Sequence, residues 1–202
     1  MTILALDTST PRGSVALWRD GATVLDEVFT ADRSHSSALF PILERARALA
    51  PRLDVIAVGL GPGSYAGVRI AIAAALGLSL AENARLVGLS SVAALETSAP
   101  SYVAVGDARR ETFYFTRVED GLCVEGPILL DEASLRERLA ASSGLPVFVP
   151  APLEVVPDGV VAIPRALRLA ELAAAGKGIL AEGDLEPLYL REPHITLPKV
   201  RK

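Results

Sequence analysis

The sequence predicts an α/β protein made of two copies of one structural unit. Each half opens with a continuous apolar run, typical of a buried central strand, which ends at Asp7 in the first half and at Asp107 in the second. A polar turn, a second strand and an Asp-Gly hairpin signal follow in both halves, at Asp20 and at Asp120. The two Asp-Gly pairs are 100 residues apart, and so are the two strand-ending aspartates. This shared offset indicates a duplicated unit. Chance agreement between common Asp-Gly hairpins is the alternative.

The first half is expected to begin with three strands and a helix. The strands are predicted over residues 2–6, 14–18 and 23–29. Apolar residues then recur at helical spacing, which predicts a helix over residues 36–50 with Ser34 or Ser36 as its N-cap. Pro41 is tolerated only in a first turn, so we place the start of this helix near it, and Pro51 ends it.

A glycine-rich turn and an apolar helix occupy residues 59–81, GLGPGSYAGVRIAIAAALGLSLA. The glycines permit positive φ and the close approach of another segment. The helix is predicted over residues 66–81, with Arg69 as its only charge, and is apolar on nearly every side. It is short for a membrane span and carries Arg69 near its start, so we expect it to lie under a sheet, against a second subunit, or both.

The remaining elements complete the two halves. We expect strands over residues 54–59 and 85–88, a helix from Ser90 or Ser91 to Ser98, strands over 102–106 and 122–130, a helix over 132–141 capped by Asp131, strands over 146–150 and 160–163, and a helix over 167–175 ended by Gly176. The tail from Glu186 is expected to be an extended surface segment. The predicted domains are residues 1–101 and a smaller, degenerate unit, 102–202.

Composition restricts the class of protein. Half of the 202 residues are hydrophobic, and the net charge of −4 argues against a stand-alone nucleic-acid binder, with the basic tail Lys199, Arg201 and Lys202 as a weak exception. The single cysteine, Cys123, rules out an internal disulfide and a Cys-based zinc cluster. The first residues enter a strand at once without a signal-peptide pattern, so we expect a cytoplasmic protein.

A strand–hairpin–strand unit followed by helix, strand and helix is the ribonuclease H-like unit. Two of them, the second degenerate, make the actin, sugar-kinase and Hsp70-type (ASKHA) fold. The segments ILALDTST, GPGSYAGVR, LSSVAAL, GDARRETFY and PLYLR together resemble the TsaB (YeaZ) family. Ala66 stands where that family usually has Thr, and Glu111 stands where it usually has Gly.

The resemblance implies a function in tRNA modification. The family is the bacterial companion subunit in the synthesis of N6-threonylcarbamoyladenosine (t6A) at position 37 of tRNAs that read codons beginning with A. By resemblance, this chain is a non-catalytic subunit that binds and positions the catalytic subunit TsaD. The ATPase TsaE would join the complex, the free chain would form homodimers, and tRNA would be reached only indirectly, with no membrane partner. The isolated chain would need no cofactor, although an adenine nucleotide is possible at the junction with TsaD.

Asp7, Ser9 and Thr10 are the candidate cofactor-binding residues. A carboxylate at a strand end is a good Mg²⁺ ligand, and the hydroxyls after it can bind phosphate. Neither DTSTP nor DARRE has a glycine directly after its aspartate, although Arg109 and Arg110 could act as anion clamps. The alternative is that Asp7 hydrogen-bonds its own turn. The glycine-rich turn matches neither GxxxxGK[ST] nor GxGxxG.

Catalytic and metal-binding residues are not predicted. His35 and His194 are far apart in the sequence and form no metal-binding spacing. The TsaD family carries two metal-binding histidines four residues apart after its fifth strand, and the matching segment here offers Ser91 and Leu95. No Ser-His-Asp arrangement can be argued from two histidines.

The two helices 36–50 and 66–81 are the candidate interface with TsaD or a second copy. An apolar strip left uncovered by the chain itself is normally an interface. The residues assigned to it are Leu39, Ile42, Leu43, Ala46, Leu49, Val68, Ile72, Ala75 and Leu76. The alternative is that both helices are covered within one chain.

Two enzymatic hypotheses stand beside the partner-subunit hypothesis. A small ATP-dependent kinase of the ASKHA superfamily would use Asp7 and Asp107 with Mg²⁺, and it would have to bind ATP alone. A metallopeptidase would need a tightly bound metal ion, for which the sequence offers no ligand set.

Overall fold

The computed structural model describes residues 1–30 and 35–191. Each half of the chain begins with a meander of three antiparallel strands, and the two meanders have the same topology. The first sheet has six strands in the order β11-β5-β4-β1-β2-β3. Its strands are β1 (Thr2–Asp7), β2 (Arg12–Arg19), β3 (Ala22–Thr30), β4 (Val55–Gly59), β5 (Arg85–Leu89) and β11 (Ile179–Glu182). β1 runs parallel to β4 and antiparallel to β2, and it is buried along its whole length, as its continuous apolar run predicts.

The second sheet repeats this arrangement with five strands in the order β10-β9-β6-β7-β8. Its strands are β6 (Ser101–Asp107), β7 (Phe113–Glu119), β8 (Leu122–Leu130), β9 (Val147–Val149) and β10 (Val160–Val161). The order 10-9-6-7-8 corresponds strand for strand to 5-4-1-2-3 in the first sheet. The predicted duplication is therefore confirmed, and the short β9 and β10 account for the degenerate character of the second copy.

Both hairpins turn on the predicted Asp-Gly pairs. Asp20 and Gly21 have φ of 49° and 90°, and Asp120 and Gly121 have φ of 48° and 79°. Positive φ at both central residues is the type I′ geometry, whose twist matches that of the flanking strands.

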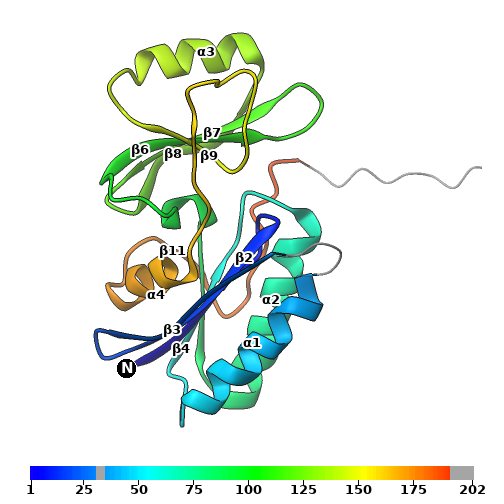
Figure 1. Ribbon diagram of the computed structural model, residues 1–202, viewed down its shortest axis with the longest axis vertical. Coiled ribbons are helices and arrows are strands. Elements are labelled where there is room, and N and C mark those ends of the chain that lie inside the picture. Colours follow the sequence, from blue (N-terminus) through cyan, green and yellow to red (C-terminus); the bar gives the residue numbers. More distant parts are fainter. Residues whose placement is uncertain (31–34, 192–202) are drawn as a thin grey trace, which may run out of the picture.

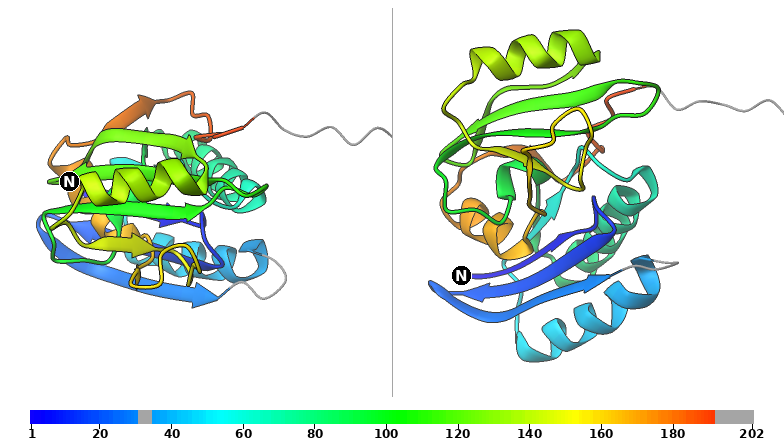
Figure 2. Two further views of the ribbon diagram at one scale, coloured as in Figure 1. Left: turned by 90° about the horizontal axis from the view of Figure 1, so that it is seen from above. Right: turned by 45° about the horizontal axis from the view of Figure 1, so that its top comes forward.

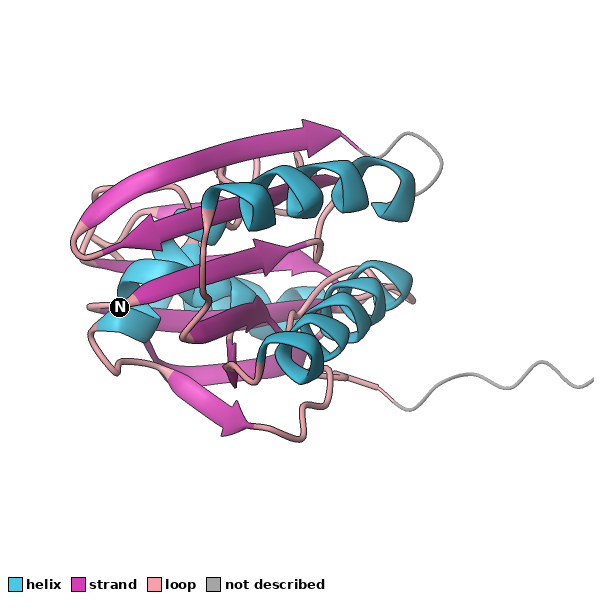
Figure 3. Cartoon of the chain, turned by 90° about the horizontal axis from the view of Figure 1, so that it is seen from below, coloured by secondary structure: helices cyan, strands magenta, loops and turns pink. Residues whose placement is uncertain are grey.

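Helices and sheets alternate in five layers (Figure 1). α1 (His35–Leu49) and α2 (Tyr65–Glu82) cover one face of the first sheet, and α4 (Ala166–Ala174) covers the other. The second sheet follows, and α3 (Glu132–Ala141) covers its outer face through Leu135. Figures 2 and 3 show α1 and α2 on the same side of the first sheet from other directions.

α2 is held at both ends by capping groups. The Ser64 hydroxyl accepts from the Gly67 N–H at its start, and Asn83 ends it in the left-handed conformation. α2 is long enough and apolar enough to cross a membrane, but core helices of soluble proteins can have the same length and mean hydropathy. Ala71, Ala74 and Ala75 pack into the core of the first sheet, which gives α2 a structural role within the fold.

Several sequence-based expectations about helices need correction. α1 begins at His35, so Pro41 lies inside it rather than in its first turn; one lost backbone bond is tolerated because Leu39 and Leu43 anchor the helix in the core. The helix expected up to Ser98 is only a short 3₁₀ helix, η1 (Ser91–Ala94). The Thr97 hydroxyl accepts from the Ala99 N–H, a local bond that competes with helix formation. The proposed cap Ser34 lies outside the described residues.

The expected division between residues 101 and 102 also needs correction. The apolar face of α4 packs on the first sheet, and β11 pairs antiparallel with β5, so residues 166–182 return to the first unit. β11 was not predicted, because its edge position leaves a short segment without clear alternation. The tail beyond it carries no helix or strand as far as residue 191, and Leu188 N–H donates to Leu60 O; the rest of the tail, with His194, lies outside the described residues.

Candidate functional site

The turn after β1 is occupied by its own hydrogen bonds. One Asp7 carboxylate oxygen accepts from the Ser9 N–H at 2.8 Å and from the Ser9 hydroxyl at 2.6 Å. The Thr8 hydroxyl donates to Gly67 O, and the Thr10 hydroxyl donates to Arg12 O, each at 2.7 Å. All four side chains are buried. These bonds correspond to the alternative in which Asp7 organises its own turn.

The glycine-rich turn lies directly on this segment. A Cβ at Gly67 would stand 2.0 Å from Thr8 O, and one at Gly63 would stand 2.2 Å from Ser9 O. The Ser64 N–H donates to Ser9 O at 2.7 Å. The glycines are therefore required for the close approach of two backbone segments, as expected from the sequence, and no Cβ could be placed at Gly63 or Gly67 without meeting Ser9 or Thr8.

The space between the two sheets near Thr10 is filled by side chains of the second unit. The cavity bounded by Thr10, Pro62, Tyr114 and Phe148 has a volume of about 10 Å³. Small-molecule sites occupy roughly 300–1,000 Å³. Burial raises the pKa of the Tyr114 phenol well above its usual value, as expected for a ring enclosed in this core. The expectation that Asp7, Ser9 and Thr10 bind a cofactor is thus not supported by the geometry of this conformation.

Asp107 differs from its counterpart Asp7. Its side chain is about half exposed and pairs with Arg109 at 3.5 Å, and its carboxylate accepts from the Arg109 N–H at 2.7 Å. Arg109 and Arg110 lie on the exposed turn between β6 and β7. The two carboxylates to which the kinase hypothesis assigns Mg²⁺ therefore differ in environment, because Asp7 is buried and Asp107 is exposed and ion-paired.

The positions that correspond to the metal-binding histidines of the TsaD family have structural roles. The Ser91 hydroxyl accepts from the Gly61 N–H at 2.9 Å, and Leu95 is buried between the two sheets. Across residues 1–30 and 35–191, no group of three or more His, Cys, Asp or Glu side chains is placed to hold a metal ion. Cys123 lies on β8, and burial raises the pKa of its thiol, which fits the expected role as a small apolar residue.

A larger cavity lies elsewhere in the molecule. It has a volume of about 440 Å³ and is bounded by η1, the start of β6 and α4. It contains none of the predicted site residues. Arg168, on its wall, already pairs with Glu171 at 2.5 Å. Size alone therefore does not make this cavity the functional site.

Most of the predicted interface residues of α1 and α2 are turned inward. Six of the nine are buried in the chain's own core: Leu39, Ile42, Leu43, Ala46, Val68 and Ala75. Ile72 is half-buried. These assignments need correction, because the periodicity that identifies an apolar helix face does not say whether that face meets the sheet or a partner.

From Ala73 onward the outward side of α2 is also apolar, whereas α1 exposes Phe40 and Leu49 together with the charged Glu44 and Arg45. Leu49 and Leu76, both predicted, are 50% and 44% exposed, and Phe40 and Leu80, which were not, are 54% and 77% exposed. We call these four residues the helix face. Around Leu76 and Leu80, α2 exposes only small residues, Ala73, Gly77 and Ala81. The exposed positions recur every three or four residues along α2, a signal that was available in the sequence.

Comparison with known proteins places the chain in a family. Residues 29–131 match the family model described as TsaD, tRNA N6-adenosine threonylcarbamoyltransferase. The Escherichia coli K12 tRNA threonylcarbamoyladenosine biosynthesis protein TsaB is 32% identical over 221 residues, which cover 95% of each chain. The chain belongs to the TsaB family.

Other TsaB relatives agree with this assignment. The TsaB protein of Bacillus subtilis is 35% identical over 103 residues, which cover 49% of this chain and 44% of that protein. The solved structure of YeaZ from Pseudomonas aeruginosa superposes with a TM-score of 0.73 at 29% identity, over 94% of this chain and 99% of that one. The TsaB fold, with its duplicated units of the ASKHA type, is therefore the fold of this chain.

Proposed function

We propose that this chain is the non-catalytic partner subunit for t6A formation at position 37 of tRNA, and that it binds and positions TsaD through the helix face. The proposal takes the pathway from the TsaB relatives and the binding surface from the structure. In this proposal the chain acts in the cytoplasm and performs no chemistry itself.

The observation that supports the surface is the exposed apolar side of α2. Leu80 leaves 77% of its surface in solvent, and Leu76 leaves 44%, one turn earlier on the same side. Full burial of one leucine side chain contributes roughly 1.5–3 kcal/mol. The neighbouring small residues Ala73 and Gly77 allow a second helix to approach closely and lose little side-chain entropy on docking. Docking of a partner helix would therefore release more free energy here than at an isolated exposed leucine.

The test is binding of TsaD to a variant that changes the helix face alone. Leu76→Glu combined with Leu80→Glu should abolish co-purification with TsaD and homodimer formation, because two charges would be buried unpaired. Val160→Glu, an exposed valine on β10, is the matched control and should bind normally. Leu43 is unsuitable for such a test, because it is buried and a charge there would unfold the chain. Undiminished binding by the double variant would contradict the proposal.

Three further parts of the proposal rest on the family resemblance: homodimers through the same helices, TsaE in the complex, and an adenine nucleotide at the junction with TsaD. Calorimetry distinguishes the nucleotide site from the kinase alternative. The TsaB–TsaD complex should bind ATP or ADP at a site that the TsaD subunit alone lacks. ATP binding by the isolated chain would favour a kinase instead, although the cavity of about 10 Å³ beside Thr10 does not favour that outcome.

A further inference from the structure

Two stacked tyrosines lie where α2 begins. Tyr65, the first residue of α2, and Tyr189, in the C-terminal segment, have ring centroids 5.2 Å apart and planes inclined by 26°. Both rings remain accessible, at 49% and 43% exposure. The Arg69 guanidinium lies 5.2 Å from the Tyr65 ring centroid and donates to the Tyr65 hydroxyl at 2.6 Å. Tyr65 and then Tyr189 raise the pKa of Arg69, which is fully exposed.

The turn between β6 and β7 holds an unusual backbone conformation nearby. Arg109, Arg110 and Glu111 have φ of 68°, 54° and 58°, three consecutive left-handed residues without a glycine. This conformation is unfavourable for any residue that carries a Cβ. The turn persists because it is fastened: Asp107 accepts from the Arg109 N–H, and the Thr112 hydroxyl and N–H both donate to Arg109 O. Strain fixed in this way is common at functional sites.

The C-terminal segment joins these two features. Arg191, two residues after Tyr189, donates to the Thr112 hydroxyl of the β6–β7 turn. The views in Figures 1 and 2 agree that the start of α2, the tail up to residue 191 and the β6–β7 turn lie on the same side of the molecule, on the right in Figure 1. We call Tyr65, Arg69, Arg109, Arg110, Tyr189 and Arg191 the arginine–tyrosine surface.

The charge of this surface is opposite to that of the whole chain. The surface contains four arginines, and the turn contributes two acidic residues, Asp107 and Glu111, so its charge is positive. The chain as a whole carries a net charge of −4. Arg109 pairs with Asp107 at 3.5 Å but keeps 88% of its side chain exposed, so Arg109 and Arg110 on the turn, with Arg69 on α2, are available to an anion. Guanidinium groups match phosphate oxygens in a bidentate geometry, and exposed aromatic rings stack on unpaired bases.

We propose that the arginine–tyrosine surface binds RNA directly, with its arginines on phosphates and its tyrosine pair stacking on an unpaired base. The inference builds on the proposed function, in which the RNA is the tRNA bound to the complex with TsaD, and it replaces the expectation that tRNA is reached only indirectly. An acidic protein surface would meet the same arginines, but it would make no use of two exposed aromatic faces beside them.

The test is the salt dependence of tRNA binding to the assembled TsaB–TsaD complex, measured by fluorescence anisotropy. The double variant Arg109→Gln with Arg110→Gln should weaken binding and make the slope of log K against log salt less negative by about 1.4, since each single-strand phosphate contact contributes about 0.7. Both substitutions keep the turn's hydrogen bonds to the backbone of Arg109, from its N–H to Asp107 and from the Thr112 hydroxyl to its carbonyl, and only the Arg109–Asp107 ion pair is lost. The control is Arg136→Gln with Arg138→Gln on α3, two exposed arginines of the outermost layer, which should change neither quantity.

A second pair of variants tests stacking. Tyr189→Ala should weaken binding at least about fivefold, the lower bound for loss of one base–aromatic stack, whereas Tyr189→Phe should retain the affinity. Unchanged affinity and salt slope in the arginine variant would overturn the inference. So would weaker assembly with TsaD at unchanged tRNA affinity, which would identify an acidic protein as the partner. Gel filtration measures assembly with TsaD, and therefore tests the proposed function by itself. Titration of the isolated chain with the same tRNA at low salt tests RNA binding without TsaD, so failure of the proposed function is distinguishable from failure of this inference.

Discussion

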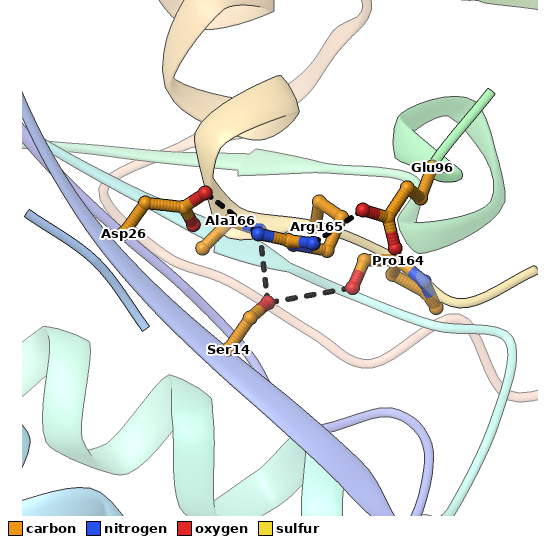
Figure 4. Close-up of polar contacts among 6 residues, drawn as sticks. All are labelled: Ser14, Asp26, Glu96, Pro164, Arg165 and Ala166. Carbon is orange, nitrogen blue, oxygen red and sulfur yellow. Dashed lines mark hydrogen bonds and ion pairs between the residues drawn. The ribbon is translucent and has the colours of Figure 1, made fainter. Parts of the chain in front are cut away.

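Arg165 donates from its guanidinium to the Asp26 carboxylate at 2.6 Å, although 139 residues separate the two in the chain (Figure 4). The same guanidinium donates to Glu96 at 2.5 Å. The Ser14 hydroxyl accepts from the Ala166 N–H at 2.8 Å and donates to Pro164 O at 3.3 Å. The start of α4 is thereby fastened to β2 and β3 of the first sheet, which explains why a helix from the second half of the chain belongs to the first unit.

Removal of the Asp26 carboxylate should destabilise the fold. Its side chain and that of Arg165 are only 23% and 18% exposed, so Asp26→Ala leaves a poorly solvated guanidinium with one partner. We expect a loss of about 1–2 kcal/mol in the free energy of unfolding, between the values for exposed and fully buried pairs. Urea denaturation measures it.

Glu171→Ala is the matched control for that experiment. It removes an ion pair of similar length, Arg168–Glu171 at 2.5 Å against 2.6 Å for Asp26–Arg165, from the more exposed side of α4. Exposed pairs of this kind contribute under about 0.5 kcal/mol. Equal effects of the two substitutions would show that the Asp26 pair is no more than a surface contact.

Local patterns were sufficient for much of the fold. The apolar runs ending at Asp7 and Asp107, and the Asp-Gly pairs, predicted both meanders and their hairpins, since each is decided by residues close in sequence. The helix over residues 132–141 and its cap Asp131 were predicted with the observed bounds. The return of α4 and β11 to the first sheet was not predictable, because it depends on long-range contacts such as Arg165–Asp26.

The candidate site was predicted at the level of elements but not of side chains. The two helices were identified correctly as apolar, yet Leu43 and Ala75 face the sheet while Leu80, unassigned from the sequence, is the most exposed leucine of α2. Hydrophobicity is the same for a residue that meets the core and for one that meets a partner. Of the arginine–tyrosine surface, Arg109 and Arg110 were noted from the sequence as possible anion clamps. The other members were missed because they come from distant segments of the chain.

Glu111→Gly should stabilise the protein. Glu111 holds φ of 58°, in the region where the TsaB family usually places glycine. The substitution relieves the left-handed strain, but glycine also gives the unfolded chain more conformational entropy. The net effect is an expected increase of about 0.5–1 kcal/mol in the free energy of unfolding. The urea midpoint measures it. Gly21→Ala, which introduces a Cβ at φ of 90° with no steric contact within 4 Å, is the converse control and should lose about 1 kcal/mol. A loss of stability in Glu111→Gly would mean that the glutamate side chain supports the turn.

The N-cap of α3 should make stability depend on acid pH. The Ser134 N–H donates to the Asp131 carboxylate at 2.8 Å and lowers the pKa of that group from its usual 3.8. Because the folded pKa lies below the unfolded one, this contribution is complete above about pH 4 and is lost as the pH falls through the folded pKa. Stability of the wild type relative to Asp131→Asn should therefore decrease in urea titrations as the pH falls below about 4.

Asp131→Ala provides the reference for that titration. It lacks the cap at every pH, so its difference from Asp131→Asn should stay constant across the range. A constant difference between wild type and Asp131→Asn would show that the charge of Asp131 does not contribute.

Gly67 is buried and Gly77 is exposed on α2, and the two should respond oppositely to substitution. A Cβ at Gly67 would meet Thr8 O at 2.0 Å, which is backbone and cannot move aside, so Gly67→Ala should cost about 3 kcal/mol. A Cβ at Gly77 meets nothing within 4 Å, and glycine is unfavourable inside a helix. Gly77→Ala should therefore raise the free energy of unfolding by about 1 kcal/mol.

The larger substitution Gly77→Gln separates stability from partner binding. Glutamine is a better helix former than glycine, so the isolated chain should become more stable by roughly 0.5 kcal/mol. On the exposed side of α2 beside Leu76 and Leu80, however, its side chain would hold a partner helix away, and affinity for TsaD should fall about tenfold or more. Chemical denaturation and calorimetric titration measure the two effects. We expect stability to rise and affinity for TsaD to fall, because Gly77 destabilises the helix and also allows the partner helix to approach closely. Unchanged affinity would mean that TsaD binds another surface.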